Sequence, residues 1–570
     1  MRGHKLNLKW LAGFLVLMVC ISCLPLMTAA AAPDYTVERW RMREITFTSA
    51  TTYADPFRDV MLDVTFTGPG DVTLVMPAFW DGGGTWKVRF APTEAGLWQY
   101  ETTCSNTADA GLHGISGTME CVPYTGDLEI YRHGFVKTVP GTRYFVYDDG
   151  TPFFYLGDTH WTMPTEPFEE MFTTIVDTRV EQGFTVYQSL PVGAPYNLAN
   201  TLTEAALAGF ADMDRRFSYI AEAGLLHANG ELIHAPELYE GMHDGRYTED
   251  YVRLLSRYWV ARYAAYPVMW TMSMEADDDF YYNRGGAGDN TYFEAKDNPW
   301  KIVAAAVGEY DPYRHPLTAH QEFASMENGA HGMNATRSEF KKLEAHTWFA
   351  AQWSPALYQS PDFNLPRDFW YNGGGKPAIN FEGRYDFFWT KHFGARAQGW
   401  ISYLNGMFGY GYGAIDIWAY QMTIDMDTTS DDRRDKITPE DKATPWTESL
   451  YFETAEQMGH MRRFLEGLEW WELEPRFDSW RWFIPWWCTP WWATSYSLAT
   501  QGNDVYVAYF YQDGRSTGLL RGLDCGPYQA EWFNPRTGES LTIGTVQPVL
   551  GCYAIPCKPD KNDWVFCLHR

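Results

Sequence analysis

The spacing of apolar positions changes twice along the chain. Residues 33–125 carry short strand-like runs, such as 72–80, separated by glycine-rich turns such as 81–84. The last stretch, 471–570, returns to this pattern, for example at 505–511. Short strands with regular turn signals are typical of β-sandwiches, so we expect one sandwich at each end of the chain.

The middle of the chain, residues 142–470, alternates apolar runs of strand length with amphipathic stretches of helical length. The stretch 166–182, for example, places Phe168, Met171, Phe172, Ile175 and Val176 on one helical face. The strand-like runs lie at 153–158, 184–189, 224–229, 268–275, 316–321, 343–348, 377–382 and 407–412. Eight such units predict a (β/α)₈ barrel; the alternative, a doubly wound open sheet, normally has fewer strands.

The first residues predict export. A basic start (Arg2, His4, Lys5 and Lys9) precedes an apolar run at 11–27 and small residues at 29–32. This order is typical of a signal peptide, so we expect a secreted or periplasmic protein. Cys23 leaves lipid anchoring open as an alternative, and a retained membrane anchor is another. No second long apolar run follows, so we expect no transmembrane segment in the mature chain.

We therefore expect a multi-domain α/β protein with five parts. These are a signal peptide at 1–32, an N-terminal β-sandwich at 33–125, a linker at 126–141, a barrel at 142–470 and a C-terminal β-sandwich at 471–570.

The composition narrows the choice of partners. The 570 residues carry a net charge of −27, which repels phosphate backbones and anionic membranes and argues against nucleic acid as a partner. Aromatic residues make up 17% of the chain. Such residues suit stacking on sugar rings, and equally suit a bulky core.

The cysteines point to disulfides rather than to a metal. Removal of Cys20 and Cys23 with the signal leaves seven of the nine cysteines. Cys104 and Cys121 flank a short glycine-rich stretch, and we expect that a disulfide can bridge them across a hairpin. The mature chain has no Cys-x-x-Cys pair and no Cys/His cluster with zinc spacing, so we predict neither a metal nor a cofactor. His320 and His346 are the alternative metal ligands.

Polar and aromatic residues stand at the predicted carboxyl ends of the strands, where a barrel has its active site. Carboxylates, imidazoles and aromatic rings suit sugar recognition, whereas no phosphate-binding or dinucleotide motif is present. The candidate substrate-binding residues are Asp158, His160, Trp161, Gln188, Asp277, His320, His346, Trp348, Arg384, Tyr385, Tyr410 and Tyr412.

Two glutamates are the candidate catalytic residues. Glu275 ends the predicted fourth strand and Glu382 the seventh, and these strands face each other across a barrel mouth. Glycoside hydrolysis needs two carboxyl groups, one to protonate the leaving oxygen and one to attack or to activate water. The alternative is that either glutamate is a structural ion-pair partner, for instance of Arg384.

Four motifs resemble those of the apiosidase-like glycoside hydrolases. They are Tyr155-Leu-Gly-Asp-Thr-His-Trp161, Trp270-Thr-Met-Ser-Met-Glu275, Lys376-Pro-Ala-Ile-Asn-Phe-Glu-Gly-Arg-Tyr385 and Phe408-Gly-Tyr-Gly-Tyr-Gly413. The terminal domains are similar to the β-sandwich fused in front of this family and to the small sandwich of collagen-binding type behind it. The resemblance implies a retaining (β/α)₈ enzyme with Glu275 as acid/base and Glu382 as nucleophile. The family commonly has Gly-Gly-Asp where this chain reads Ser273-Met-Glu275, which leaves Asp277 as a second candidate for the acid.

The expected function is hydrolysis of glycosidic bonds in plant or microbial oligo- or polysaccharide. The alternative is an exported protein that binds carbohydrate, or adheres, without cleaving it.

Overall fold

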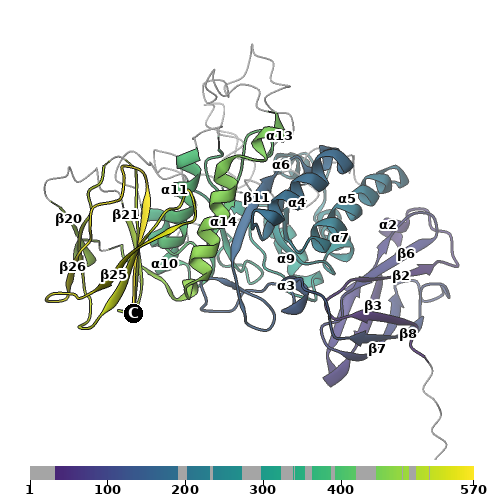
Figure 1. Cartoon of the computed structure of the whole chain (residues 1–570). Helices are drawn as coiled ribbons and strands as arrows, with labels where there is room; N and C mark the ends of the chain where they lie inside the picture. Colours follow the sequence, from purple (N-terminus) through teal and green to yellow (C-terminus); the bar gives the residue numbers. More distant parts are fainter. Residues whose placement is uncertain are drawn as a thin grey trace, which may run out of the picture.

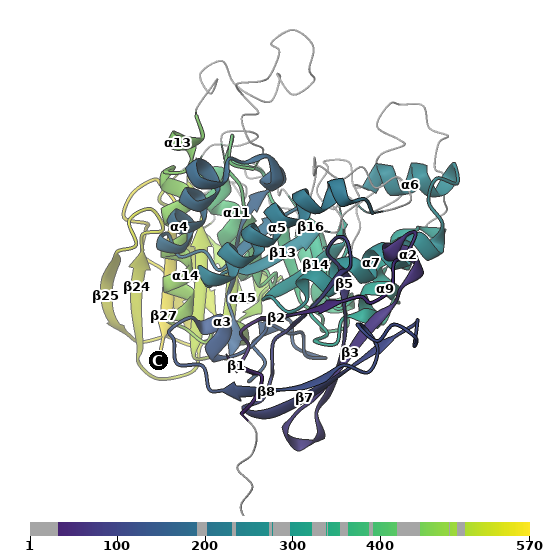
Figure 2. The ribbon, with the colours of Figure 1, turned by 90° about the vertical axis from the view of Figure 1, so that its right-hand side faces the viewer.

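A computed structural model describes residues 32–190, 202–230, 235–272, 276, 297–321, 338, 340–353, 363–386, 392–418, 445–477, 479–486, 496–512 and 514–570. A β-rich domain lies on each side of a central α/β domain, with the N-terminal one drawn in purple and the C-terminal one in yellow (Figures 1 and 2). Among the described residues, no helix has the length and apolarity to cross a membrane. The predicted signal peptide and Cys23 lie outside them.

The N-terminal domain consists of two sheets, in the strand orders β1-β8-β7-β3-β4 and β2-β6-β5. Along β7 (Gly96–Cys104), buried and exposed residues alternate, because one face of the strand packs on the core. The other bounds are β1 (Tyr35–Glu38), β2 (Arg43–Thr48), α2 (Pro56–Asp59), β3 (Leu62–Thr67), β4 (Thr73–Pro77), β5 (Phe79–Trp80), β6 (Thr85–Phe90) and β8 (Ser116–Val122). The strand expected at 72–80 is thus divided between the two sheets.

The expectation of a bridge between Cys104 and Cys121 is wrong. The two strands pair with Gly96 opposite Cys121, so Cys104 lies eight residues farther along β7. At roughly 3.3 Å per residue that offset is about 26 Å, far beyond the 4.4–6.8 Å between the Cα atoms of a disulfide. Both cysteines are free and buried.

The central domain is built on eight parallel strands in the order β14-β13-β12-β11-β18-β17-β16-β15. The strands are β11 (Tyr155–His160), β12 (Val186–Ser189), β13 (Leu226–Gly230), β14 (Val268–Met272), β15 (His320–Gln321), β16 (Phe349–Gln352), β17 (Ala378–Glu382) and β18 (Gly409–Tyr412). Most of their residues are buried, as expected for parallel strands covered on both faces.

Helices cover the outer face of this sheet (Figure 2). The helices of this domain are α4 (Thr173–Glu181), α5 (Glu204–Glu222), α6 (Ala235–His243), α7 (Glu249–Tyr263), α9 (Trp300–Tyr310), α10 (Asn364–Asn372), α11 (His392–Leu404), α13 (Trp446–Ser449) and α14 (Glu453–Glu466), of which α6 and α13 lie at the rim. Before the sheet come α3 (Glu129–Arg132), β9 (Phe145–Val146) and β10 (Pro152–Phe153). A π-helical turn, Phe168–Phe172, leads into α4, so the helix expected at 166–182 has an irregular first part.

The sheet curls strongly. Nε2 of Gln188 in β12 donates a hydrogen bond of 2.9 Å to the carbonyl oxygen of Phe381 in β17, although two strands lie between them in the sheet order. A parallel bridge also joins Trp270 of β14 to Leu317, just before β15. The fold is that of a parallel barrel-like sheet between two β-rich domains.

One predicted strand is misplaced. The run 343–348 was expected to form a strand that ends with His346 and Trp348, but the strand is β16, which begins at Phe349. The alternation of polar and apolar residues at 343–348 resembles a half-buried strand. The real strand is the short apolar run that follows, as is typical of parallel sheets. His346 and Trp348 therefore precede the strand and lie toward its amino end.

The C-terminal domain has two sheets, in the orders β19-β21-β22-β27-β24-β25 and β20-β23-β26. Their bounds are β19 (Glu474–Pro475), α15 (Ser479–Trp482), β20 (Phe483–Pro485), β21 (Tyr496–Gln501), β22 (Val505–Phe510), β23 (Gly518–Arg521), β24 (Tyr528–Phe533), β25 (Ser540–Val546), β26 (Cys552–Ala554) and β27 (Trp564–His569).

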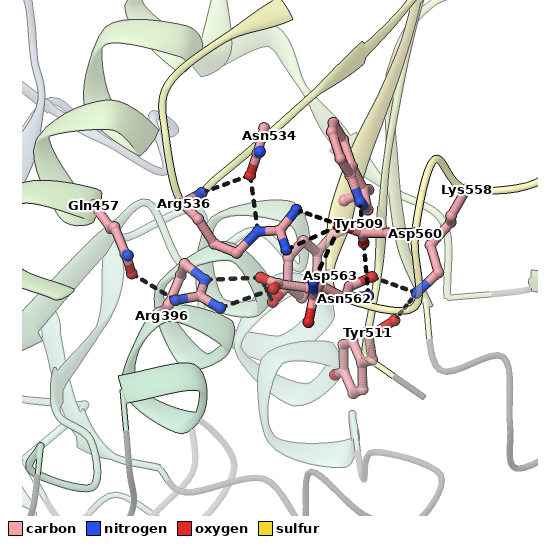
Figure 3. Close-up of polar contacts among 11 residues, drawn as sticks. Arg396, Gln457, Tyr509, Tyr511, Asn534, Arg536, Lys558, Asp560, Asn562 and Asp563 are labelled. Atoms are coloured by element: carbon pink, nitrogen blue, oxygen red, sulfur yellow. Dashed lines mark hydrogen bonds and ion pairs between the residues drawn. The ribbon is translucent and has the colours of Figure 1, made fainter. Parts of the chain in front are cut away.

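Buried polar and apolar contacts fix this domain to the central one. Arg396 of α11 donates two hydrogen bonds of 2.8 Å to Asp563, and the hydroxyl of Tyr509 donates a third, of 2.9 Å (Figure 3). Beside this ion pair, the ring of Trp400 lies 6.0 Å from Tyr509 and 5.9 Å from Phe533. The two domains thus share one continuous apolar cluster.

Candidate active site

Glu382 ends β17 and faces the inside of the curled sheet because of a bulge. Asn380 points outward, where its Nδ2 donates to Oγ of Ser402 in α11. Strict alternation would turn Glu382 outward as well. However, Asn380 pairs with Ala351 and Glu382 with the next residue, Gln352, so Phe381 is an extra residue. Such a bulge re-aims the side chains that follow it.

Two described residues, Tyr385 and His320, lie against the Glu382 carboxylate, which is 4% exposed. The hydroxyl of Tyr385 donates a short hydrogen bond to Oε1, and Nε2 of His320 lies 3.3 Å from Oε2. Nε1 of Trp161 donates a hydrogen bond of 2.7 Å to the Tyr385 hydroxyl. The structure therefore brings together Trp161, His320 and Tyr385 of the predicted set around Glu382.

His320 is a neutral partner in this group. Complete burial lowers the pKa of its imidazole to about 3, so the ring is uncharged at neutral pH. Its ring is packed between Phe381, with centroids 5.1 Å apart, and Trp161, at 5.8 Å. A neutral imidazole can donate one N–H to a carboxylate without titrating with it.

Tyr385 is held from behind by Trp418 and Gly413. Its ring stacks on Trp418 with centroids 4.9 Å apart. A Cβ atom at position 413 would lie only 2.2 Å from the Tyr385 ring, so this approach requires glycine. This contact gives a structural reason for the last glycine of the motif 408–413.

The other candidate strand, β14, is also bulged near its carboxyl end. Asn229 pairs with Trp270 and the next residue, Gly230, pairs with Met272, so Thr271 is extra. Met272 has a backbone φ of 54°, a left-handed conformation that is uncommon for residues other than glycine. Glu275 and Asp277 themselves lie outside the described residues.

Asp158 and His160 turn away from Glu382, contrary to the expectation. The Asp158 carboxylate accepts a hydrogen bond of 2.6 Å from Nε of Arg179 in α4, and Nε2 of His160 lies 2.9 Å from the same oxygen. Nδ1 of His160 lies 3.6 Å from Glu166. All four side chains are buried between the sheet and α4. We call Asp158, His160, Glu166 and Arg179 the outer charge network.

The charges in the outer charge network stabilise one another. Burial by itself disfavours the ionised form of Asp158, but the charges of Arg179 and His160 outweigh it and lower the pKa of Asp158. Burial likewise disfavours protonated His160, but Asp158 and Glu166 outweigh it and raise the pKa of His160. The network is a buried set of opposite charges, and substrate binding by Asp158 and His160 stays a prediction.

Three other predicted residues are buried within the sheet or on its outer side: Gln188, Tyr410 and Tyr412. Gln188 fills the inside of the sheet, where it accepts a 3.0 Å hydrogen bond from the Tyr155 hydroxyl. Tyr412 pairs with Asp158 and Tyr410 with Leu156, so both tyrosines share the outward side. Arg384, half-buried two residues after Glu382, uses its backbone N–H to donate to Oε1 of Gln398 at 2.9 Å.

His346 and Trp348 precede β16 and lie toward its amino end. His346 contacts Phe349 at 5.0 Å between ring centroids, and Lys376 donates a 2.5 Å hydrogen bond to its carbonyl oxygen. Trp348 packs on Phe145, whose ring centroid is 5.4 Å away, and on Phe381, at 5.9 Å. Neither residue stands at the carboxyl end of a strand as expected, and their role in substrate binding stays a prediction.

Sequence reasoning missed Arg179, Glu166 and Trp418. Arg179 had a visible signal, because it continues the apolar face of 168, 172, 175 and 176 in helical spacing. An arginine on such a face indicates a buried partner.

Among the described residues, no three His, Cys, Asp or Glu side chains form a metal-binding group. That catalysis needs no metal stays a prediction.

Comparisons with known proteins agree with this architecture. Three family models match: "Apiosidase-like, catalytic domain" at 139–472, "Domain of unknown function (DUF5060)" at 36–105 and "Putative collagen-binding domain of a collagenase" at 492–569. No curated protein matches the sequence significantly.

Solved structures show the same fold. A "putative glycoside hydrolase" from Bacteroides vulgatus is 17% identical and has a TM-score of 0.65 over 94% of this chain and 99% of its own. A glycoside hydrolase family 5 protein from the same organism is 17% identical and has a TM-score of 0.58 over 77% of this chain and 94% of its own. The catalytic-domain match covers more than half of the sequence, and the chain therefore belongs to the apiosidase-like family.

Proposed function

We propose that this chain is an exported retaining glycoside hydrolase that acts on plant or microbial oligo- or polysaccharide. Glu382 is the nucleophile and Glu275 the acid/base, with Asp277 as the second candidate for the acid. The observation that carries the proposal is the inward, buried carboxylate of Glu382, on which Tyr385 and His320 converge. Family membership supports the reaction class.

The proposal includes a closed (β/α)₈ barrel between two β-sandwiches. The bridge between Trp270 and Leu317 supports closure, because it links the two end strands of the sheet order. In a closed barrel, β14 and β17 lie opposite each other across the mouth of the barrel. The domain limits proposed from the sequence, 33–125, 142–470 and 471–570, belong to the same proposal.

The donors around Glu382 suit a nucleophile. In a retaining hydrolase, the carboxylate attacks the anomeric carbon while the acid protonates the leaving oxygen; water then cleaves the glycosyl-enzyme ester. A carboxylate attacks only when ionised, and the hydrogen bond from the Tyr385 hydroxyl favours that form. This hydrogen bond and the His320 ring, 3.3 Å from the other oxygen, hold the carboxylate in one orientation, which lowers the entropy cost of attack.

The stereochemistry of the first product tests the mechanism. Wild-type protein is given a panel of 4-nitrophenyl pyranosides and furanosides, and NMR follows the anomer that is first released from the best substrate. Retention is expected, with the anomer of the product matching that of the substrate. Inversion would contradict the role of Glu382 as nucleophile, and glycan binding without any release would favour the alternative of a non-catalytic binding protein.

Substrates with different leaving groups test the role of Glu275 as the acid separately. Glu275→Ala is expected to slow substrates with poor leaving groups far more than nitrophenyl glycosides, because a good leaving group needs little protonation. Asp277→Ala is the matched control. If Asp277→Ala produced this selectivity and Glu275→Ala did not, Asp277 would be the acid.

A further inference from the structure

Trp161 lies behind the groups that face Glu382. It follows directly after β11, and its side chain is 4% exposed. Its backbone N–H donates a hydrogen bond of 2.8 Å to the carbonyl oxygen of Trp418, the residue on which Tyr385 stacks. The position of the indole is therefore fixed by both its backbone and its burial.

The Trp161 indole determines the direction of the hydrogen bonds that reach Glu382. An indole N–H can only donate, so the Tyr385 oxygen accepts from it, at 2.7 Å. A phenol has a single proton, and with this acceptor role filled by Trp161, the Tyr385 proton points to Oε1 of Glu382. Without the indole N–H, the hydroxyl group can rotate and can accept from other donors.

The His320 ring, the second group at the carboxylate, also packs on Trp161. The ring of His320 lies against the indole, at 5.8 Å and 30° between the rings, and against Phe381. Trp161 thus contacts both Tyr385 and His320, the two described residues whose polar atoms face the carboxylate. His160, the preceding residue, is fixed on the outer face by Asp158, which anchors the peptide that carries the indole.

We propose that Trp161 is a positioning residue for Glu382. It fixes the Tyr385 hydroxyl as a donor and the His320 ring in place, and thereby holds the carboxylate in its reactive, ionised orientation, without itself contacting the sugar. This inference rests on the proposed function of Glu382 as nucleophile.

The test compares Trp161→Phe, Tyr385→Phe and the double variant, with Trp400→Phe as a matched control. Trp400 is also a buried tryptophan, but it belongs to α11 and its ring packs on Tyr509 of the C-terminal domain. The probe is the 4-nitrophenyl glycoside that wild type hydrolyses fastest, and the pH profile of kcat/KM is measured for each protein.

We expect Trp161→Phe to lower kcat by about 10–100-fold while KM changes little, a loss typical of a lost positioning or proton-handling group. The acidic limb of the profile should move to higher pH, because the ionised form of Glu382 loses an aligned donor. The titratable groups that the described residues place at this carboxylate are His320, whose pKa of about 3 keeps it neutral above that pH, and Tyr385. The double variant should resemble Tyr385→Phe, because both changes break the same chain of hydrogen bonds.

Contrary outcomes are distinct from failure of the proposed function. A raised KM with unchanged kcat and acidic limb in Trp161→Phe would show that Trp161 binds sugar, and additive losses in the double variant would show independent roles. Full activity of Glu382→Gln would instead overturn the proposed function. If Trp161→Phe does not fold, replacement of Trp161 by 3-benzothienylalanine removes only the N–H, and the same shift of the acidic limb is expected.

Discussion

Asp158 lies two residues before the end of β11 and Glu382 ends β17 in the same sheet, yet their surroundings are opposite. Asp158, on the outer face, is held by the guanidinium of Arg179 and by the ring of His160, whose pKa the neighbouring carboxylates raise. Glu382, on the inner face, meets the hydroxyl of Tyr385 and an uncharged His320. One carboxylate is locked in an ion pair, and the other is held by neutral donors.

The difference teaches that a position at the end of a strand does not define a catalytic carboxylate. An ion pair with a buried arginine makes a carboxylate a weak nucleophile, because reaction would leave the arginine uncompensated. Neutral donors orient a carboxylate and leave its charge available. Which environment a residue meets depends on the side of the strand that it faces, and at Glu382 the Phe381 bulge decides this.

The largest expected effect is a loss of activity on substitution of Glu382, which distinguishes this residue from Asp158. Glu382→Gln keeps the shape of the side chain but removes the nucleophile, so turnover of the best nitrophenyl glycoside should fall by about 10⁴-fold. The melting temperature should change little, since glutamine keeps the volume of the side chain and its oxygen can still accept the Tyr385 hydrogen bond. Loss of activity together with a large loss of stability would instead indicate that Glu382 is a structural residue.

The matched change on the outer face should act on stability. Asp158→Asn leaves buried Arg179 without its carboxylate, and such a change typically costs about 3–5 kcal/mol of unfolding free energy. Thermal and urea unfolding measure the cost. Turnover well below the melting temperature should decrease far less than in Glu382→Gln. If Asp158→Asn abolished turnover without a change in stability, the outer charge network would belong to catalysis.

The smallest expected effect is the pH dependence of stability. The raised pKa of His160 means that its contribution is complete below its unfolded pKa of about 6.5 and is lost as pH rises through the folded value. The lowered pKa of Asp158 means that its contribution is complete above about pH 4 and is lost as pH falls. The gap in melting temperature between wild type and His160→Gln should therefore be widest near pH 5–6 and narrow above neutral pH. A gap that widens with rising pH would show that His160 is neutral in the network.

The sequence predicted where the strands lie along the chain better than it predicted which side of the sheet each side chain faces. Most strand-like runs overlap observed strands, because a buried parallel strand is a continuous apolar run. The Phe381 and Thr271 bulges have no compositional mark, since an extra residue is visible only as a shift in pairing. For this reason Asp158 and Glu382 look equivalent in the sequence.

The candidate site was predicted in part for the same reason. Trp161 and Tyr385 were selected from their places in the motifs and His320 from its place at the end of a predicted strand, and they meet at Glu382. Their mutual contacts join residues as far as 224 positions apart, such as Trp161 and Tyr385, and no local pattern specifies them. Asp158 and His160 were assigned to the wrong face, although Arg179 on an apolar helical face was a usable signal for their buried partner.

The docking of the C-terminal domain affects how such a gene can recombine. Exchange of residues 471–570 for an unrelated module would leave Arg396 buried without Asp563 and expose the ring of Trp400 to water. A fusion at this boundary therefore needs compensating changes in α11 before it yields a folded product. We expect the central and C-terminal parts to be inherited as one unit, unlike appendages that are joined by a tether and shuffled freely between enzymes.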